Sequence, residues 1–398
     1  MSDVADVLVV GAGPAGATLG YLLASAGLDT VVVDRADGPT VKVGESLLPE
    51  GVRLCKKMGL ASELASGRFM PKHGAQFVLS SDGVRDRFVF AEALRASGAE
   101  IAYQVKRLDF DDMLVRHAES AGARVRWGFA VREVDLGSES EVGVRTAEGE
   151  HLRARYLVDA SGQAHVLARQ LGLRQPMSEL RKVAMWSHFD GIPRDAGDAA
   201  GDITVLWSES GWFWLIPFPD GSTSVGVVGD PTVLDAAGGS DQERFDTLSA
   251  ATPVHREFLA GRRQLAPIRR HADYSYRCGT TTGERFLLIG DASGFIDPIF
   301  STGVFLAQSG AFRAAEMLVP PLSCGQLPDG EARRAFENHL NLGVRRYLGL
   351  VHRFYDGEFM NGVIRSRRRG QVRRALTSVL SGDVYDEANP LLRMGVFA

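Results

Sequence analysis

The chain has 398 residues, enough to bury a sizeable core and to divide into two or three interleaved units. The composition is that of an ordinary globular protein, and the formal net charge of −4 gives no general attraction to nucleic acid or to an anionic membrane. Three cysteines without C-x-x-C spacing make a disulfide framework or a metal site unexpected. The N-terminal apolar run is too short for a signal or membrane helix, so we expect a cytoplasmic protein.

The first 34 residues predict a nucleotide-binding β-α-β unit. An apolar run over 5–10 enters the sequence GAGPAG at 11–16, a helix rich in Ala and Leu follows, and a strand over 30–33 ends in Asp34. In such a unit Gly11 permits the tight turn, Gly13 lets the backbone approach a pyrophosphate, and Gly16 lets helix and strand pack closely. The helix N-terminus would hold phosphates and Asp34 a ribose hydroxyl. The predicted cofactor contacts here are Gly11, Gly13, Ala15, Gly16, Asp34 and Arg35.

Helices and strands alternate beyond this unit. The hydrophobic periodicity predicts one helix and several strands, at 108–121 for the helix and at 124–131, 142–146, 156–159 and 286–289 for the strands. A long strand-like stretch rich in Trp, Phe, Val and Thr runs from 182 to 228, and the sequence after about 320 is helical and increasingly basic. These patterns predict an α/β protein.

Two later segments select FAD over NAD. The run RFLLIGDA at 285–292 resembles the second FAD motif of the glutathione-reductase and hydroxybenzoate-hydroxylase group, in which Asp291 would take a ribityl hydroxyl beside Gly290. A helix N-cap is the alternative role for Asp291. The segment 103–111 resembles that group's segment in which an arginine, here Arg107, contacts the flavin.

This resemblance implies a Rossmann-type FAD-binding fold with an inserted β-sheet substrate domain and a helical C-terminus. The FAD-binding domain would comprise 1–75, 100–180 and 280–320, the substrate domain 76–99 and 181–279, and the helical region 321–398. Only one G-x-G-x-x-G run is present. A separate NAD(P)H domain is therefore not expected, and FADH2 would come from a partner flavin reductase, although hydroxybenzoate-type hydroxylases bind NADPH without such a domain.

Three further motifs narrow the resemblance to flavin-dependent halogenases. The run GWFWLIP at 211–217 contains the W-x-W-x-I-P signature of that family, and FIDPIFSTG at 295–303 matches its F-x-x-P-x-x-S-x-G motif. The run FMPKHG at 69–74 resembles the segment with its catalytic lysine, and 43–46, 273–276 and 382–385 extend the likeness over most of the chain. The phenol and pyrrole branch is the most similar. Several members of that branch act on substrates tethered to a carrier protein.

The resemblance implies a role for each motif. Reduced FAD and O2 would form a flavin hydroperoxide, which chloride or bromide would convert to hypohalous acid. Free N–H groups at the start of a helix favour an anion, so the halide site would be Ser301, Thr302 and Gly303. Lys72 would carry the halogen as a chloramine or polarise the acid by a hydrogen bond. The remaining flavin contacts implied are Glu45, Ser46, Pro298 and Gly303.

Trp212 and Trp214 would lie on one face of a strand and keep the organic substrate away from the flavin. The two tryptophans could equally be ordinary core aromatics. Lys72 could likewise be a solvated surface residue, as most lysines are. The expected activity is halogenation, with chlorination favoured, of a phenolic or pyrrolic ring in natural-product biosynthesis. A flavin-dependent aromatic hydroxylase and a catalytically silent flavoprotein are the alternatives.

A run of arginines near the C-terminus could contact an acidic partner. No acidic residue occurs between Glu358 and Asp383, whereas six arginines do, at 365, 367, 368, 369, 373 and 374. The patch could attract an acidic carrier protein or its phosphopantetheine phosphate. A solvated helix face is the simpler alternative.

Overall fold

The computed structural model describes residues 4–94, 100–137, 140–208, 211–272, 275–366 and 370–397. Asp273 and Tyr274, part of one motif, and the arginines at 367–369 lie outside these ranges. Within them, no helix is both long enough and apolar enough to cross a membrane.

A mixed sheet near the N-terminus carries the β-α-β unit. Its strands are β1 (Val4–Val10), β2 (Thr30–Val33), β7 (Arg124–Arg126), β8 (Val131–Asp135), β9 (Val142–Thr146), β10 (His151–Asp159) and β19 (Phe286–Leu288). Their order is β7-β2-β1-β10-β9-β8, and β19 also pairs with β10. Strand β2, most of β1 and the second half of β10 are nearly continuous runs of buried apolar residues, as central strands covered on both faces require.

The carboxyl ends of four parallel strands meet along one edge of this sheet. Val10 is in register with both Val33 and Asp159, and Asp159 with Leu288. The segments that follow β1, β2, β10 and β19 therefore lie together, and these include the first glycine run and the GDA turn at 290–292. In open sheets of this kind, ligands bind beyond the carboxyl ends of the strands.

The prediction of a single strand at 124–131 is wrong. The chain forms β7 parallel to β2, turns over 127–130, and then forms β8 antiparallel to β9. Gly128 turns the chain with φ +71°, and its N–H donates to the Ala36 carbonyl oxygen at 2.9 Å. The apolar alternation continues through the turn, so periodicity alone did not reveal it.

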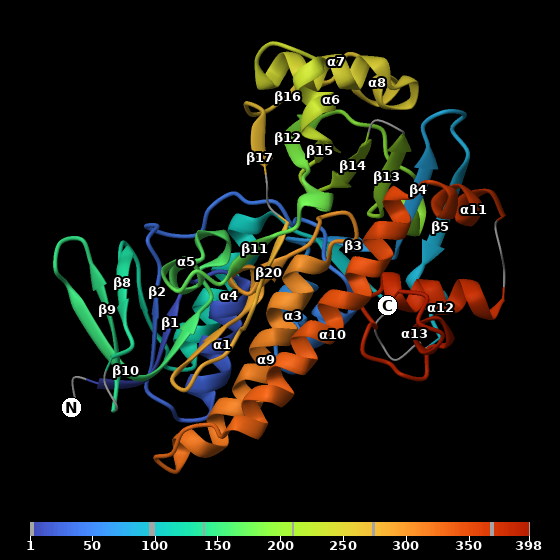
Figure 1. The fold of residues 1–398 in the computed structure, drawn as a ribbon. Helices are drawn as coiled ribbons and strands as arrows, with labels where there is room; N and C mark the ends of the chain where they lie inside the picture. The colour runs from blue at the N-terminus through green and yellow to red at the C-terminus, as the bar shows by residue number, and fades with distance from the viewer. Residues whose placement is uncertain are drawn as a thin grey trace.

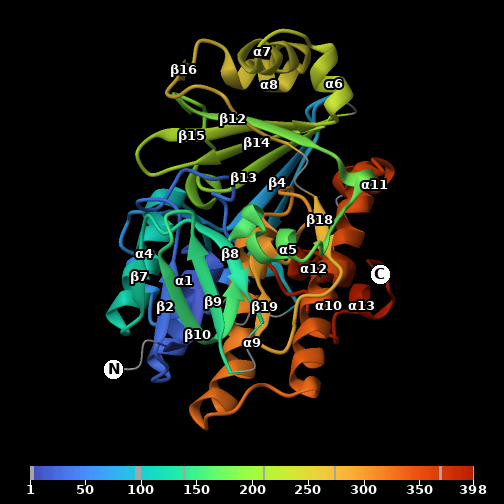
Figure 2. The ribbon, with the colours of Figure 1, turned by 60° about the vertical axis from the view of Figure 1, so that its left-hand side comes forward.

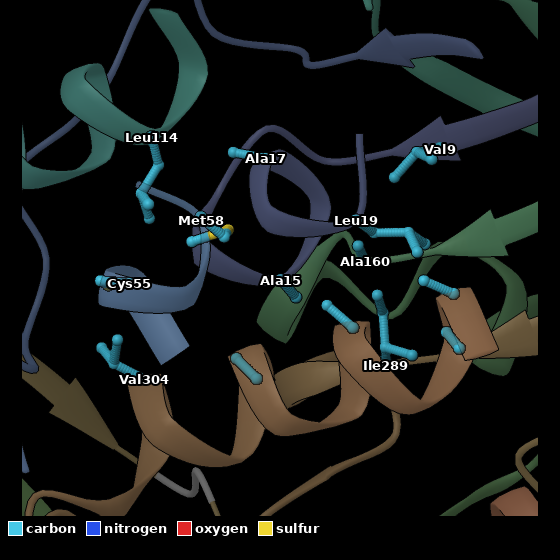
Figure 3. Close-up of a cluster of buried hydrophobic side chains, with 14 of the residues drawn as sticks. Val9, Ala15, Ala17, Leu19, Cys55, Met58, Leu114, Ala160, Ile289 and Val304 are labelled. Carbon is cyan, nitrogen blue, oxygen red and sulfur yellow. The ribbon is translucent and has the colours of Figure 1, made fainter. Parts of the chain in front are cut away.

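Several helices pack together beside the first sheet. They are α1 (Pro14–Ser25), α2 (Pro49–Lys57), α4 (Arg107–Ser120), α9 (Thr302–Ser323) and α10 (Gly330–Tyr355). Helix α1 packs against both α4 and α9, and α10 packs along α9 (Figure 1). Figure 3 shows part of the shared core, where Ala15 and Leu19 of α1 lie toward Ile289, and Val304 of α9 lies beside Cys55 of α2. The small side chains of α1 allow this close approach of helices and sheet.

A second, largely antiparallel sheet forms the other layer. Its strands are β4 (Gly74–Leu79), β5 (Arg85–Val89), β12 (Val183–Asp190), β13 (Ile203–Ser208), β14 (Gly211–Pro217), β15 (Ser222–Gly229), β16 (Arg263–Gln264) and β17 (Arg269–Ala272). The order is β16-β12-β15-β14-β13-β4-β5, with β17 also on β12, and only β13 and β4 are parallel. The domain boundaries suggested by the sequence stay a prediction.

The two faces of this second sheet have different partners. The face that includes Phe213 and Val227 packs under α6 (Pro231–Ala236), α7 (Asp241–Ala251) and α8 (Pro253–Leu259), which lie at the top of Figure 2. Trp212 and Trp214 belong to the opposite face, whose core also contains Phe300 and Phe354. The alternation of side chains along β14 thus sends its tryptophans toward the interior of the molecule.

Short elements complete the fold. Two small sheets pair β3 (Met70–Lys72) with β6 (Ala102–Gln104), and β18 (Tyr276–Cys278) with β11 (Arg174–Pro176) and β20 (Gly294–Phe295). The short helices are α3 (Ala61–Leu64), α5 (Val166–Gln170), α11 (Glu358–Ser366), α12 (Gln371–Leu380) and α13 (Pro390–Arg393). Helices α11 and α12 lie beside the β4–β5 hairpin (Figure 1).

This packing changes the interpretation of the C-terminal arginines. Arg365 pairs with Asp82 at 2.7 Å, and Arg373 pairs with Asp86 at 2.6 Å while its guanidinium lies 4.4 Å from the centre of the Phe88 ring. Both therefore join the C-terminal helices to the hairpin instead of presenting free charge. Arg374 remains exposed.

His255 of α8 is buried in the apolar layer under the helical cap. It is 0% exposed, and its ring centre lies 4.1 Å from that of Phe213. Neither ring nitrogen has a hydrogen-bond partner among the described residues. Burial lowers the pKa of His255 from 6.5 to about 3, because the apolar surroundings disfavour the charged form.

His255 should make the protein sensitive to acid. The unfolded state binds the proton below 6.5 and the folded state only near 3, so stability falls with pH in this window by up to ~1.4 kcal/mol per unit. When the pH is lowered from about 7.5 to about 5, we expect the melting temperature to fall less in His255→Phe than in the wild type. Thermal unfolding measures this, with the exposed His352→Gln as control. Equal losses in His255→Phe and the wild type would contradict it.

Candidate active site

The glycine run after β1 has the geometry of a phosphate-binding turn. Gly11 has φ +106°, and a Cβ there would lie 2.3 Å from the Ala160 carbonyl oxygen. A Cβ on Gly16 would lie 1.8 Å from the Gly11 oxygen. A Cβ on Gly13 would meet nothing within 4 Å, so the space in front of this residue is open at the N-terminus of α1. The turn therefore fits the pyrophosphate of a dinucleotide.

Asp34 stands beside this turn at the end of β2. One carboxylate oxygen accepts from the Ala12 N–H and the other from the Ala36 N–H, both at 2.9 Å. The side chain is only partly buried, and each oxygen keeps a lone pair with which a ribose hydroxyl could bond. The side chain of the neighbouring Arg35 is exposed.

The GDA turn lies against the start of α1. Gly290 has φ +59°, and a Cβ there would lie 3.0 Å from Ala15 Cβ, so only glycine lets the two segments approach this closely. Asp291 sits in a 3-10 turn, with α9 beginning only at Thr302, and it makes no side-chain cap. The N-cap interpretation of Asp291 is wrong. Burial raises the pKa of Asp291 to about 6, against the opposing effect of Arg107.

Arg107 holds the loop that carries Glu45 and Ser46. This first residue of α4 is buried and binds Asp111 through two 2.9 Å hydrogen bonds, while its Nη1 donates to the Val43 oxygen at 2.7 Å. The Glu45 carboxylate in turn accepts a hydrogen bond from His188 Nε2 of β12 at 2.9 Å. The loop is thus anchored to α4 and to strand β12 of the second sheet.

The segment 298–303 forms the start of helix α9. Ser301 occupies the N-cap position at φ +56° without a side-chain cap, and its N–H donates to the Pro298 oxygen at 3.0 Å. Thr302 and Gly303 are the first helical residues, as the predicted loop-to-helix junction requires. The N-terminus of this 22-residue helix favours a bound anion through its N–H groups and its dipole. Halide binding there stays a prediction.

Lys72 is an ionisable group buried deep in the site. It is 1% exposed, and its Nζ donates to the Ser46 hydroxyl and to the Leu47 carbonyl oxygen, both at 2.9 Å. The Phe90 ring centre lies 5.3 Å away. Burial lowers the pKa of Lys72 from 10.5 to about 7, while the negative charge of Asp202 acts in the opposite direction. A lysine with these surroundings can act as an amine near neutral pH.

The two tryptophans of β14 are held by polar contacts as well as by packing. Their ring centres are 5.6 Å apart. The Trp214 indole donates to the Ser224 hydroxyl at 3.1 Å and lies over Gly226, where a Cβ would come within 2.2 Å of the ring. The Trp212 indole donates to the Tyr355 hydroxyl at 3.0 Å. The indoles therefore have defined positions.

Three residues near this pair were not identified from the sequence. Tyr355 of α10 donates to the Asp297 carboxylate at 2.9 Å, linking the W-x-W-x-I-P run to the F-x-x-P-x-x-S-x-G run. Trp186 of β12 lies on the Trp214 face, and its indole N–H has no partner among the described residues. Asp297 occupies a variable position of its motif and so gave no signal, and burial raises its pKa to about 7.

The structure gathers these residues into two groups. The first group surrounds the carboxyl edge of the first sheet and consists of the glycine run, Asp34, Gly290, Asp291 and Arg107. Lys72 belongs to the small sheet next to the second layer, and its hydrogen bonds to Ser46 and Leu47 link it to the loop held by Arg107. In the described part of the chain, no cluster of His, Cys, Asp or Glu could hold a metal ion.

Comparison with known proteins first gives the class. The chain matches the model of the family described as FAD binding domain over residues 4–326. With the phosphate-binding turn and the GDA turn at one sheet edge, the protein is an FAD-binding flavoprotein of the α/β class.

Individual relatives then give the family. The chain is 33% identical over 385 residues to the flavin-dependent halogenase armH4 of Armillaria mellea, covering 88% of this chain and 72% of that protein. It is 29% identical over 405 residues to the 1H-pyrrole-2-carbonyl peptidyl-carrier-protein chlorinase of Pseudomonas fluorescens, covering 96% and 89%. The structure of the flavin-dependent brominase Bmp2 superposes with TM-score 0.87 at 26% identity, covering 98% of each chain. The chain belongs to the flavin-dependent halogenases, which use FAD, a halide and O2.

Proposed function

We propose that this halogenase chlorinates a phenolic or pyrrolic ring in natural-product biosynthesis and that Lys72 transfers the halogen. The burial of Lys72 carries the proposal, because an amine held inside the protein with its pKa near 7 can meet a small oxidant away from solvent. Bound FAD in its reduced form, with O2 and halide, supplies hypohalous acid. The lysine would take the halogen as the N–halogen bond forms and the O–halogen bond breaks, and the displaced hydroxide would leave with an amine proton as water.

The other site residues would bind and separate the reactants. We assign the flavin to the glycine run, Asp34, Arg107 and the GDA turn, and the halide to the N–H groups at the start of α9. Trp212 and Trp214 would exclude the organic ring from the flavin, and their fixed indoles support this role. A phenol or pyrrole is activated by its own substituents, so the protein need mainly hold the ring in position.

Two partners belong to the proposal. A flavin reductase would supply FADH2, in keeping with the single dinucleotide fingerprint. A carrier protein bearing the ring is the second, and the relative from Pseudomonas fluorescens is named for such a substrate. If exposed arginines such as Arg374 contribute to docking, carrier binding should weaken with salt. Carrier binding that does not depend on ionic strength would show that these arginines do not contribute to docking.

Product analysis tests the proposal. Purified protein is supplied with FAD, a flavin reductase, O2 and chloride or bromide. The substrates are phenolic acids and pyrrole-2-carboxylic acid, each in free and carrier-bound form. Product masses are measured by mass spectrometry. A halogen mass shift on a phenol or pyrrole is expected. An oxygen mass shift would identify hydroxylation, and an unchanged set of rings would contradict the proposed substrate class.

A further inference from the structure

The Ser46–Leu47 segment holds the Lys72 amine in one orientation. The Lys72 Nζ is 2.9 Å from the Ser46 hydroxyl oxygen and 2.9 Å from the Leu47 carbonyl oxygen. Within the described ranges these are its hydrogen bonds, and all three residues are buried. The contact spans 26 residues of sequence, so it depends on the packing of two separate segments.

Strand β6 fixes both partners of this contact. Lys72 is paired with Ala102 in the β3–β6 sheet, and Ser46 forms a bridge with Gln104 two residues farther along β6. On either side of Ser46, the Leu47 N–H donates to the Tyr103 oxygen at 2.9 Å and the Val105 N–H to the Glu45 oxygen at 2.7 Å. Because lysine and serine are both attached to β6, their relative position is set by backbone hydrogen bonds.

The same strand is tied to the second sheet. The buried Gln104 amide donates to the Gly201 oxygen at 2.9 Å, and the next residue, Asp202, accepts from the His73 N–H at 3.0 Å. A Cβ on Gly201 would lie 1.8 Å from the Pro71 oxygen, so this turn packs directly on β3. The backbone that carries Lys72 is therefore held from both sides.

The two hydrogen bonds determine where the amine can react. A neutral amine has two N–H bonds and one lone pair. The Leu47 carbonyl can only accept, and the Ser46 hydroxyl oxygen accepts the second N–H. The lone pair then occupies the one remaining tetrahedral position of Nζ. In the ammonium form a third N–H points in that same direction.

We propose that Ser46 is a positioning residue for halogen transfer, which it serves through Lys72, and is not a flavin contact. The inference rests on the proposed role of Lys72 in transferring the halogen. Without the hydroxyl, the Leu47 oxygen alone would leave the amine free to rotate about a single hydrogen bond. The reacting lone pair would then lose its fixed direction, and misplacement of a reacting group by about 1 Å can cost about 100-fold in rate.

Substitution of Ser46 tests this role with matched variants. Ser46→Ala removes the acceptor, Ser46→Thr keeps it, and Ser46→Cys keeps the side-chain shape with a weak acceptor. Ser249→Ala is the control, because Ser249 is also buried and bonds a backbone oxygen, that of Phe245, but lies in α7. Each variant is assayed with reduced FAD, O2 and bromide on resorcinol or the carrier-bound ring, whichever the wild type halogenates. FAD affinity and oxidation of reduced FAD are measured in parallel.

For Ser46→Ala we expect product to fall by about 10- to 100-fold while FAD affinity and flavin oxidation stay at wild-type values. Ser46→Thr should recover most of the product, Ser46→Cys should resemble Ser46→Ala, and Ser249→Ala should match the wild type. Wild-type product from Ser46→Ala, or a parallel loss of FAD affinity, would overturn the assignment. Failure of the proposed role of Lys72 would be a separate result. In that case Lys72→Met would itself still form halogenated product.

Discussion

Lys72→Met is expected to lower halogenated product by at least about 100-fold while the protein still binds FAD and still supports the oxidation of reduced FAD by O2, because general acid–base and nucleophilic groups contribute factors of this size. Methionine fills a similar buried volume, so the effect reports the missing amine and not a cavity. Product is measured by mass spectrometry and flavin oxidation by absorbance.

Lys57→Met is the matched control for this substitution. Lys57 is exposed at the end of α2, and its replacement should leave the product yield unchanged. Product from Lys72→Met at the wild-type level would remove the lysine from the mechanism. Loss of bound FAD in Lys72→Met would instead indicate that the substitution disturbs the fold around Ser46.

The pH dependence of halogenation should show which form of Lys72 acts. Burial lowers the pKa of this amine to about 7, so the neutral fraction rises as the pH passes through that value. Transfer through a neutral amine predicts that product formation increases between about pH 6 and about pH 8 and then levels off. A polarising ammonium predicts the opposite trend, which the initial rates at saturating reduced FAD would reveal.

Gly13→Ala should lower FAD affinity by at least about 10-fold without destabilising the protein, since one displaced phosphate contact costs more than ~1.4 kcal/mol. A Cβ at this position meets no protein atom within 4 Å, so the added methyl group can only obstruct what approaches the turn from outside. Flavin fluorescence gives the affinity, and thermal unfolding of the apoprotein gives the stability.

Neighbouring glycines provide the comparison for this result. Gly16→Ala should disturb the fold itself, because its Cβ would lie 1.8 Å from the Gly11 oxygen. Gly38→Ala, where the added Cβ also meets nothing within 4 Å, should change neither quantity. Unaltered FAD affinity in Gly13→Ala would mean that the pyrophosphate does not pass over this turn.

The sequence by itself determined the features that depend on local pattern. The apolar runs of β1 and β2, the glycines between them and the GDA turn predicted an FAD-binding α/β protein, because strand burial and positive φ angles are set within a few residues. The start of α9 after Ser301 was predicted for the same reason. Local pattern failed at 127–130, where apolar alternation continues through a turn that Gly128 makes.

Only the tertiary structure decided which side chains meet. The contacts of Lys72 with Ser46, of Trp212 with Tyr355 and of Arg365 with Asp82 join segments 26, 143 and 283 residues apart. No periodicity or spacing encodes such pairs, because they form when separate layers pack and bury polar groups that must then find partners. Packing therefore gave Ser46 its lysine partner and removed two arginines from the basic patch.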